Sequence, residues 1–199
     1  MKYEIKSFMH KSLPVIQEAS IKGRNKLIDE KIKTTCKAGC SSCCSRPINI
    51  TLIEAAIIMN LLKRKGLWER VRAKASELQE FDTIDRFTWF RMKIMCPVLD
   101  TDTNLCLAYE NRPMECALHY VTSPAKSCDP WGTSVIEYKK VDNDSFYHEL
   151  VTRLTSIVGD SIWVFEAPVY KALLLAEVFK SKEIADQDTL IQAMSKERI

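Results

Sequence analysis

Apolar side chains recur at helical spacing along several stretches of this 199-residue chain. The pattern predicts an amphipathic helix over residues 13–33, with Pro14 in its first turn, where a proline removes no helical hydrogen bond. Thr51 and Glu54 have the spacing of a capping box, which is typical of a helix N-terminus. We therefore expect a second, strongly apolar helix to begin there and to end near Lys65.

Further helices are predicted on both sides of an irregular middle region. A more polar helix is expected over residues 67–81, and apolar residues at helical spacing predict helices over 146–158 and 167–182. Residues 96–132 are irregular in pattern and rich in Cys, Pro, Asp and Asn. We find no internal repeat, linker or strand–helix alternation. The expected fold is mainly α, a single domain over residues 1–199.

Composition and charge exclude some partners. The chain is 46% hydrophobic and 28% charged, and its 29 basic and 26 acidic residues are spread without a basic run, so nothing indicates nucleic-acid binding. The start of the chain has no apolar stretch of signal-peptide length. The runs IEAAIIMNLL and YKALLLAEVF are too short to span a bilayer and contain Glu54 or Glu177. We therefore expect no membrane partner and a cytoplasmic location, whose reducing conditions disfavour disulfides.

Eight cysteines are the strongest chemical signal in the chain, and four of them lie in the run CKAGCSSCC. They lie in turn-like sequence that contains Gly, Ser, Pro, Asp and Asn, and none lies in the terminal helical stretches. Clustered cysteines in a cytoplasmic protein more often bind metal than fill a core. We expect a metal-binding region over residues 34–132, around which the helices pack. The candidate ligands are Cys36, Cys40, Cys43, Cys44, Cys96, Cys106, Cys116 and Cys128.

The cysteines alone do not identify the metal. Thiolates are soft ligands that select zinc, copper(I) or iron–sulfur clusters. Cys43 and Cys44 suit a multi-iron cluster or two neighbouring sites, because adjacent side chains diverge and so fit poorly around one ion. Eight thiols allow two four-ligand sites, or one cluster with spare thiols. Of the three histidines only His119 lies in this region, and we expect it to be a turn residue.

The spacing of Cys36, Cys40 and Cys43 also matches that by which radical S-adenosylmethionine enzymes hold a four-iron cluster. Those enzymes usually carry an aromatic residue where this chain has Ser42, and they need a series of βα units. We therefore expect no such barrel, although an open iron that binds S-adenosylmethionine in another fold stays open. Residues 100–104 are similar to the first half of an EF-hand calcium loop. The positions that should hold its glycine and its glutamate are Leu105 and Asn111, so we interpret residues 100–104 as a polar turn.

The runs CKAGCSSCC, CPVLD, CLAYENRPMEC and SCDPWG together resemble the bacterial YkgJ-like cysteine-cluster family, a zinc- or iron-chelating domain with a CxxCxxCC signature. The likeness covers residues 34–132 and matches all eight cysteines. The first gap holds three residues instead of two, and Ala117 stands where the family commonly has arginine. The resemblance implies metal chelation. Distant relatives include a flagellin lysine N-methylase associated with an iron–sulfur cluster.

Two functional hypotheses follow. The first is an iron–sulfur protein that acts in redox chemistry or group transfer. S-adenosylmethionine would be a further cofactor if the transferred group is methyl. The sequence does not identify the substrate, which is a protein or a small molecule. The alternative is a zinc-stabilised interaction module without catalysis. No catalytic residue is assigned. Glu54 is expected either to cap its helix or to present a carboxylate to the cluster. Arg112 is expected to pair with the cluster, with a substrate carboxylate or with an acidic residue in a salt bridge. Three aromatic residues are expected to shield the cluster from solvent: Tyr109, Tyr120 and Trp131.

The early cysteines at 36–44 and the later ones at 96–128 are expected to depend on each other. Four thiols in nine residues, two of them adjacent, can hardly all converge on one small centre. The intervening residues are enough for two helices to leave and return. We therefore predict that the metal joins the two groups and that ligation is coupled to folding.

Overall fold

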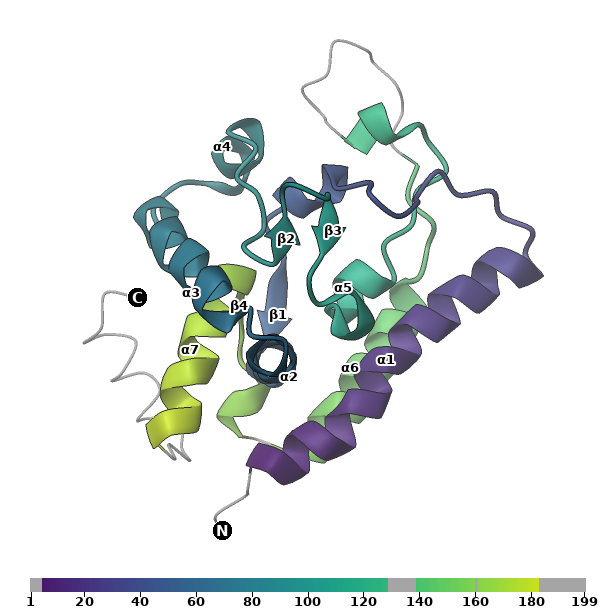
Figure 1. Cartoon of the computed structure of the whole chain (residues 1–199). Helices are drawn as coiled ribbons and strands as arrows, with labels where there is room; N and C mark the ends of the chain where they lie inside the picture. The colour runs from purple at the N-terminus through teal and green to yellow at the C-terminus, as the bar shows by residue number, and fades with distance from the viewer. Residues whose placement is uncertain (1–4, 129–138, 160, 183–199) are drawn as a thin grey trace.

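The computed structural model describes residues 5–128, 139–159 and 161–182, and these are mainly helical, as predicted (Figure 1). The first helix, α1, spans Ile5–Asp29. The predicted start at residue 13 is therefore wrong, and Pro14 lies inside the helix. Phe8 and Met9 explain the earlier start, because they extend the buried face of α1 beyond the proline. That extra burial outweighs the one helical hydrogen bond that Pro14 cannot donate.

Helix α2, Leu52–Arg64, confirms the predicted apolar helix and its capping box. Thr51 Oγ1 accepts a hydrogen bond from the Glu54 backbone N–H at 3.3 Å, and a Glu54 carboxylate oxygen accepts one from the Thr51 N–H at 2.9 Å. Nearly all of α2 is buried, as expected for a helix that is apolar on every side. It packs against α7, Val169–Lys182, and forms the centre of the core.

Two short strands explain why α7 begins at Val169 and not at residue 167 as predicted. Strand β1, Asn49–Thr51, pairs antiparallel with β4, Glu166–Pro168, and Ile50 lies opposite Ala167. Each strand leads directly into its helix, so β1 and β4 bring the starts of α2 and α7 together. Helix α6, Asp144–Val158, covers the predicted 146–158 helix and lies along α1 (Figure 1).

The predicted 67–81 helix is confirmed as α3, Trp68–Glu77, continued by a 3-10 turn η2, Leu78–Phe81. A short helix α4, Arg86–Arg91, follows, and the Asp85 carboxylate caps it by accepting hydrogen bonds from the Phe87 and Thr88 N–H groups. Figure 1 shows α4 standing apart from the helical core, near the hairpin of β2 and β3.

The cysteine-bearing region is irregular, as predicted, with short elements inside it. These are η1, Ser42–Ser45; β2, Leu99–Asp100; β3, Leu105–Cys106; η3, Tyr109–Asn111; α5, Met114–Ala117; and η4, Ala125–Cys128. Strands β2 and β3 form a hairpin. Its turn is the polar turn expected at residues 100–104: an Asp100 oxygen accepts from the Asp102 N–H, and Asn104 has φ 56°.

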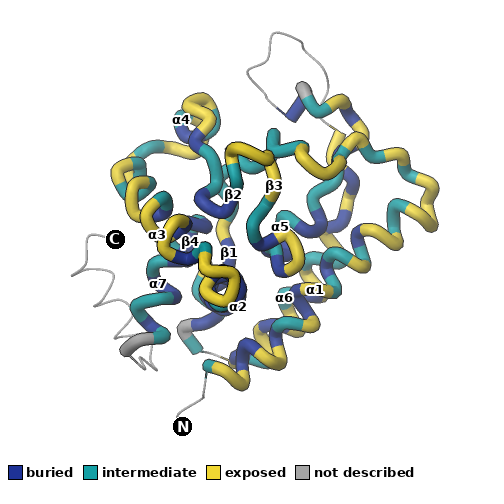
Figure 2. The backbone as a smooth tube through the Cα atoms, viewed as in Figure 1, coloured by how far each residue is buried: buried dark blue, intermediate teal, exposed yellow. Residues whose placement is uncertain are grey.

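Figure 2 shows the division that results: buried positions line the inner faces of the helices, whereas the loops above them are largely half-buried or exposed. Within the described ranges, no helix combines the length and apolar character that a membrane span requires. Residues 129–132, the end of the predicted cysteine region, lie outside the described residues.

Candidate metal centre

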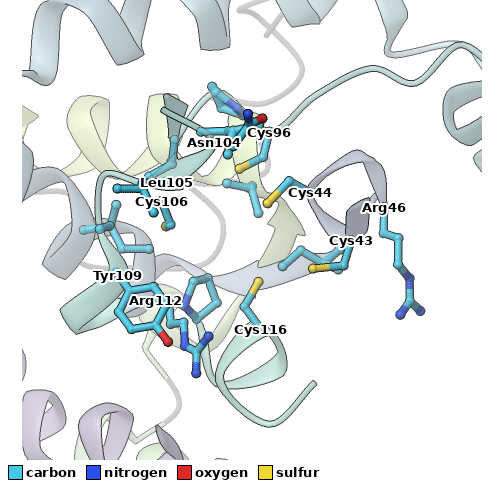
Figure 3. Close-up of a pocket in the computed structure, with 18 of the residues that line it drawn as sticks. Cys43, Cys44, Arg46, Cys96, Asn104, Leu105, Cys106, Tyr109, Arg112 and Cys116 are labelled. Atoms are coloured by element: carbon cyan, nitrogen blue, oxygen red, sulfur yellow. The ribbon is translucent and has the colours of Figure 1, made fainter. Parts of the chain in front are cut away.

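A cavity of about 140 Å³ lies where η1, the β2–β3 hairpin, α5 and the start of α7 meet. Its walls are mostly apolar, and the reactive groups among them are mainly cysteine thiols. Figure 3 shows the sulfur atoms of Cys43, Cys44, Cys96 and Cys116 directed toward a common space. Six of the eight candidate ligands line the cavity: Cys40, Cys43, Cys44, Cys96, Cys106 and Cys116.

The early and late cysteines lie side by side, as the sequence predicted. The Cys96 N–H donates a hydrogen bond to the Cys44 carbonyl at 2.8 Å, and Ser41 Oγ bonds to Asn104 Oδ1 at 3.1 Å. Helices α2 and α3 leave and return between the two groups. Cys106 is opposite Leu99 in the hairpin, so β3 carries a third segment to the cavity. That the metal joins these segments stays a prediction.

The other two candidates, Cys36 and Cys128, are absent from the lining of this cavity. Cys36 Sγ accepts a hydrogen bond from the Val121 N–H at 3.4 Å. Cys128 is buried on η4, which packs against η1. Burial raises the pKa of Cys128 to about 11, and the nearby thiols of Cys43, Cys36 and Cys40 add to the rise. Cys43 therefore lies between a cavity group and an outer group of thiols.

The thiols of the cavity strongly affect one another. A side-chain hydrogen bond from Cys44 lowers the pKa of Cys43 to about 6, assisted by the positive charges of Arg46 and Arg112. The same hydrogen bond and burial raise the pKa of Cys44. Burial raises the pKa of Cys96 to about 12, with Cys106 adding to it. Burial and mutual repulsion oppose the ionisation of several of these thiols, and a shared positive centre would favour it.

A single metal ion needs closely grouped ligands. A tetrahedral zinc ion holds each sulfur at about 2.3 Å, which requires the sulfurs to be nearly in contact. Within residues 5–128, 139–159 and 161–182, no three Cys, His, Asp or Glu side chains are grouped closely enough to hold one metal ion. His119 does not line the cavity. The Arg46 guanidinium lies 3.1 and 3.2 Å from its ring nitrogens, and burial, with that charge, lowers the pKa of His119 to about 4.

Glu54 does not line the cavity, so of its two expected roles the structure supports the cap. It has a further contact that the sequence did not predict: Glu54 Oε1 accepts a hydrogen bond from the Met114 N–H at 2.9 Å. Burial raises the pKa of Glu54, while its hydrogen bonds from Met114 and Thr51 act in the opposite direction. Met114 is the first residue of α5, which carries Cys116. Glu54 therefore ties the central helix of the core to a candidate ligand.

Among the expected covering residues, Tyr109 lines the cavity and is 52% exposed. Tyr120 lies behind it, where its ring packs so closely on α1 that a side chain at Gly23 would approach it to 2.9 Å. That contact explains a glycine within the helix. Trp131 lies outside the described residues. Arg112 lines the cavity beside Tyr109, and its guanidinium carbon is 4.6 Å from the Tyr109 ring centroid.

An aromatic wall was missed by sequence reasoning. Trp89 of α4 and Tyr170 of α7 both line the cavity, and their rings stack at 5.3 Å and 13°. The Tyr170 hydroxyl donates to Asp82 Oδ1, which anchors the wall to the loop before α4. Trp89 is in a helix of six residues, too short to show a clear period, and Tyr170 fits the helical pattern of α7 like any core residue. Periodicity therefore holds no signal that would have paired them.

Comparison with protein families identifies a matching family model. The family model described as "CxxCxxCC: Putative zinc- or iron-chelating domain" matches residues 35–144, more than half of the chain. No curated protein and no solved structure matches the chain.

Proposed function

This chain belongs to the CxxCxxCC family of zinc- or iron-chelating domains, and from that premise we propose that it holds an iron–sulfur cluster in the cavity. The observation that supports this most is the convergence of thiols from separate segments on one apolar cavity. These segments are the loop and turn around η1, the loop with Cys96 that precedes the β2–β3 hairpin, β3 itself and α5. Cys43 or Cys44, Cys96, Cys106 and Cys116 would be the ligands closest to the cluster.

The arrangement of the thiols, more than their donor chemistry, favours a cluster over a single ion. Every candidate ligand is a thiol, and sulfur-only sets suit iron–sulfur clusters as well as zinc. A cluster binds each thiolate through a different iron, so it tolerates thiols that are near one another without being in contact. The neighbouring Cys43 and Cys44 are also easier to satisfy in this way, because each can bind a different metal atom.

The chain's own residues would exclude water from such a cluster and balance its charge. Ile48, Ile58, Val98 and the Trp89 ring form apolar walls, which control solvent access and reduction potential. Arg112 and Arg46 supply positive charge near Cys43. When bound, an iron–sulfur cluster supplies one-electron transfer or a metal on which a group can be bound. We therefore propose a redox or group-transfer role and place electron transfer first.

S-adenosylmethionine is the narrower proposal, supported by the spacing of Cys36, Cys40 and Cys43. Cys36 lies outside the cavity that the other two line, so a shared cluster would require it to approach. Calorimetry with cluster-loaded protein tests this point. Measurable binding of S-adenosylmethionine supports group transfer, and its absence leaves electron transfer or sensing.

The deciding experiment is metal analysis of the full chain after anaerobic, iron-replete expression. We expect brown protein containing iron and acid-labile sulfide. Colourless protein with stoichiometric zinc would contradict the cluster and support the alternative, a zinc-stabilised interaction module.

The ligand set is tested by single substitutions in the late cysteines. Cys106→Ser and Cys116→Ser should each lower the iron content and the melting temperature, because ligation and folding are coupled. Unchanged iron content and stability in both variants would show that these residues are ordinary core thiols.

A further inference from the structure

Arg112 is a guanidinium at the cavity that lacks a carboxylate partner within the described part of the chain. Its Nη2 donates to the Ala117 carbonyl and the Tyr120 hydroxyl, each at a long 3.4 Å, and its Nε is buried with no hydrogen-bond partner. A guanidinium in such a place is costly unless an anion pairs with it.

The acidic residues nearest to Arg112 in sequence are engaged elsewhere. Glu110 Oε1 pairs with Lys65 Nζ at 2.5 Å. Glu115 is half-buried, and the cations that act on its carboxyl group are Arg46, Arg86 and Lys140. Neither carboxylate balances Arg112, so besides the thiols of Cys43 and Cys106, whose pKa values it lowers, its charge is available to an anion in the cavity.

The position of Arg112 suits recognition at the cavity mouth. Its guanidinium carbon is 4.6 Å from the Tyr109 ring centroid, a cation–π distance, and Tyr109 and Leu105 are both about half exposed, at 52% and 46%. Figure 3 shows Arg112 beside Tyr109, on the opposite side of the group from Cys44 and Cys96. A planar guanidinium matches the two oxygens of a carboxylate.

We propose that Arg112, backed by Tyr109, binds the carboxylate of a small molecule whose apolar part lies along the cavity wall formed by Leu105, Val98 and Trp89. This inference rests on the proposed function, because it assigns a substrate class to the same site. The class is a small carboxylic acid with an apolar or aromatic body. The apolar walls favour such a body, and Arg112 supplies the one interaction that distinguishes an acid from its neutral analogue.

Benzoate and benzamide test this directly, since they share a shape and differ in charge. Calorimetric titration of the cluster-loaded full chain should show saturable benzoate binding, with benzamide at least about tenfold weaker. Benzoate should also change the visible absorption of the cluster. Equal binding of both compounds, or no benzoate binding by protein with full iron and sulfide content, would overturn the proposal.

Variants separate recognition from charge balance. Arg112→Gln should weaken benzoate binding about tenfold and leave benzamide binding unchanged. Arg112→Lys keeps the charge without the planar fork, so an intermediate loss is expected. Arg24→Gln removes an exposed cation from α1 and should change neither titration. If Arg112→Gln lowers iron content while the benzoate-to-benzamide ratio stays at its original value, Arg112 only balances the cluster and the proposal fails.

The failure of this inference and that of the proposed function can be distinguished. Iron and sulfide are measured first, and their absence contradicts the cluster alone. The ratio of benzoate to benzamide affinity is then measured on the same protein with whatever metal it holds. Since the contacts that place Arg112 come from the chain, that ratio and its loss in Arg112→Gln decide the inference in either case.

Discussion

The helical core and the cysteine-bearing region are built on different physical principles. Helix α2 is buried along most of its length and packs against α7, so its stability comes from apolar area removed from water. In the cysteine-bearing region the elements are two to four residues long, and of the eight cysteines only Cys128 is fully buried. Elements that short have little stability of their own.

The difference shows where each region obtains its order. We expect the core to fold from its own sequence pattern. The cysteine-bearing region depends on a few contacts to that core, such as the Glu54–Met114 hydrogen bond, and on the metal that we propose. Four predictions test this division, from the largest expected effect to the smallest.

Removing the metal should have the largest effect, and it should be uneven. A region with so little apolar core gains most of its folding free energy from metal binding. Binding of structural zinc to small domains releases about 10–16 kcal/mol of free energy, which stabilises the fold. Chelation under anaerobic, reducing conditions should therefore increase hydrogen exchange strongly over residues 96–128 and much less in α2 and α7. A uniform increase over both regions would show that they fold as one unit.

Leu173→Ala tests the core itself. Leu173 is 0% exposed in α7, so its truncation should lower the free energy of unfolding by about 2–5 kcal/mol. Iron content measured well below the melting temperature should not change. Ile28→Ala, at an exposed position of α1, is the matched control and should have little effect. Loss of iron in folded Leu173→Ala protein would contradict the independence of the two regions.

Glu54→Gln tests the link between them. A glutamine cannot accept from both the Met114 and Thr51 N–H groups with its two terminal atoms, because one of them is itself a donor. Denaturant unfolding should show a loss of about 1–3 kcal/mol, and iron content should also fall, since α5 carries Cys116. The control is Glu69→Gln at the exposed surface of α3. If Glu54→Gln protein is less stable but keeps its full iron content, Glu54 only caps α2 and does not support the metal site.

The smallest effect concerns pH. The pKa of His119 is about 4, below its ordinary 6.5, because burial and the charges of Arg46 and Lys140 disfavour the imidazolium. The unfolded chain binds this proton more readily, so the stabilisation is complete above about pH 6.5 and is lost as the pH falls toward 4. His119→Gln should flatten this part of the stability profile measured by thermal unfolding. His148→Gln, at an exposed site on α6, should leave the slope unchanged if His119 is its source.

Much of the helical arrangement was predictable, since its signals are local. The Thr51–Glu54 capping box and the apolar run of α2 occur within consecutive residues, and both predictions are confirmed. The errors lie at boundaries set by distant partners. Burial of Phe8 and Met9 extends α1 past Pro14, and pairing with β1 makes residues 166–168 a strand.

The candidate site divides in the same way. All eight cysteines are visible as a pattern, and so is membership of the chelating family, because both depend on residue type and spacing. The sequence does not show which thiols line one cavity, because that depends on the tertiary structure. Six thiols line it, whereas Cys36 and Cys128 do not.

The sequence by itself determined the helical periods, the cap of α2 and a set of thiols fit for metal, because each is a property of residues close together in the chain. Only the tertiary structure decided that Glu54 holds the start of α5, that Trp89 stacks on Tyr170 and that Arg112 lines the cavity without an ion pair to a carboxylate among the described residues. These contacts join residues tens of positions apart or depend on how such segments pack. Their energies depend on distance and burial, which no local pattern encodes.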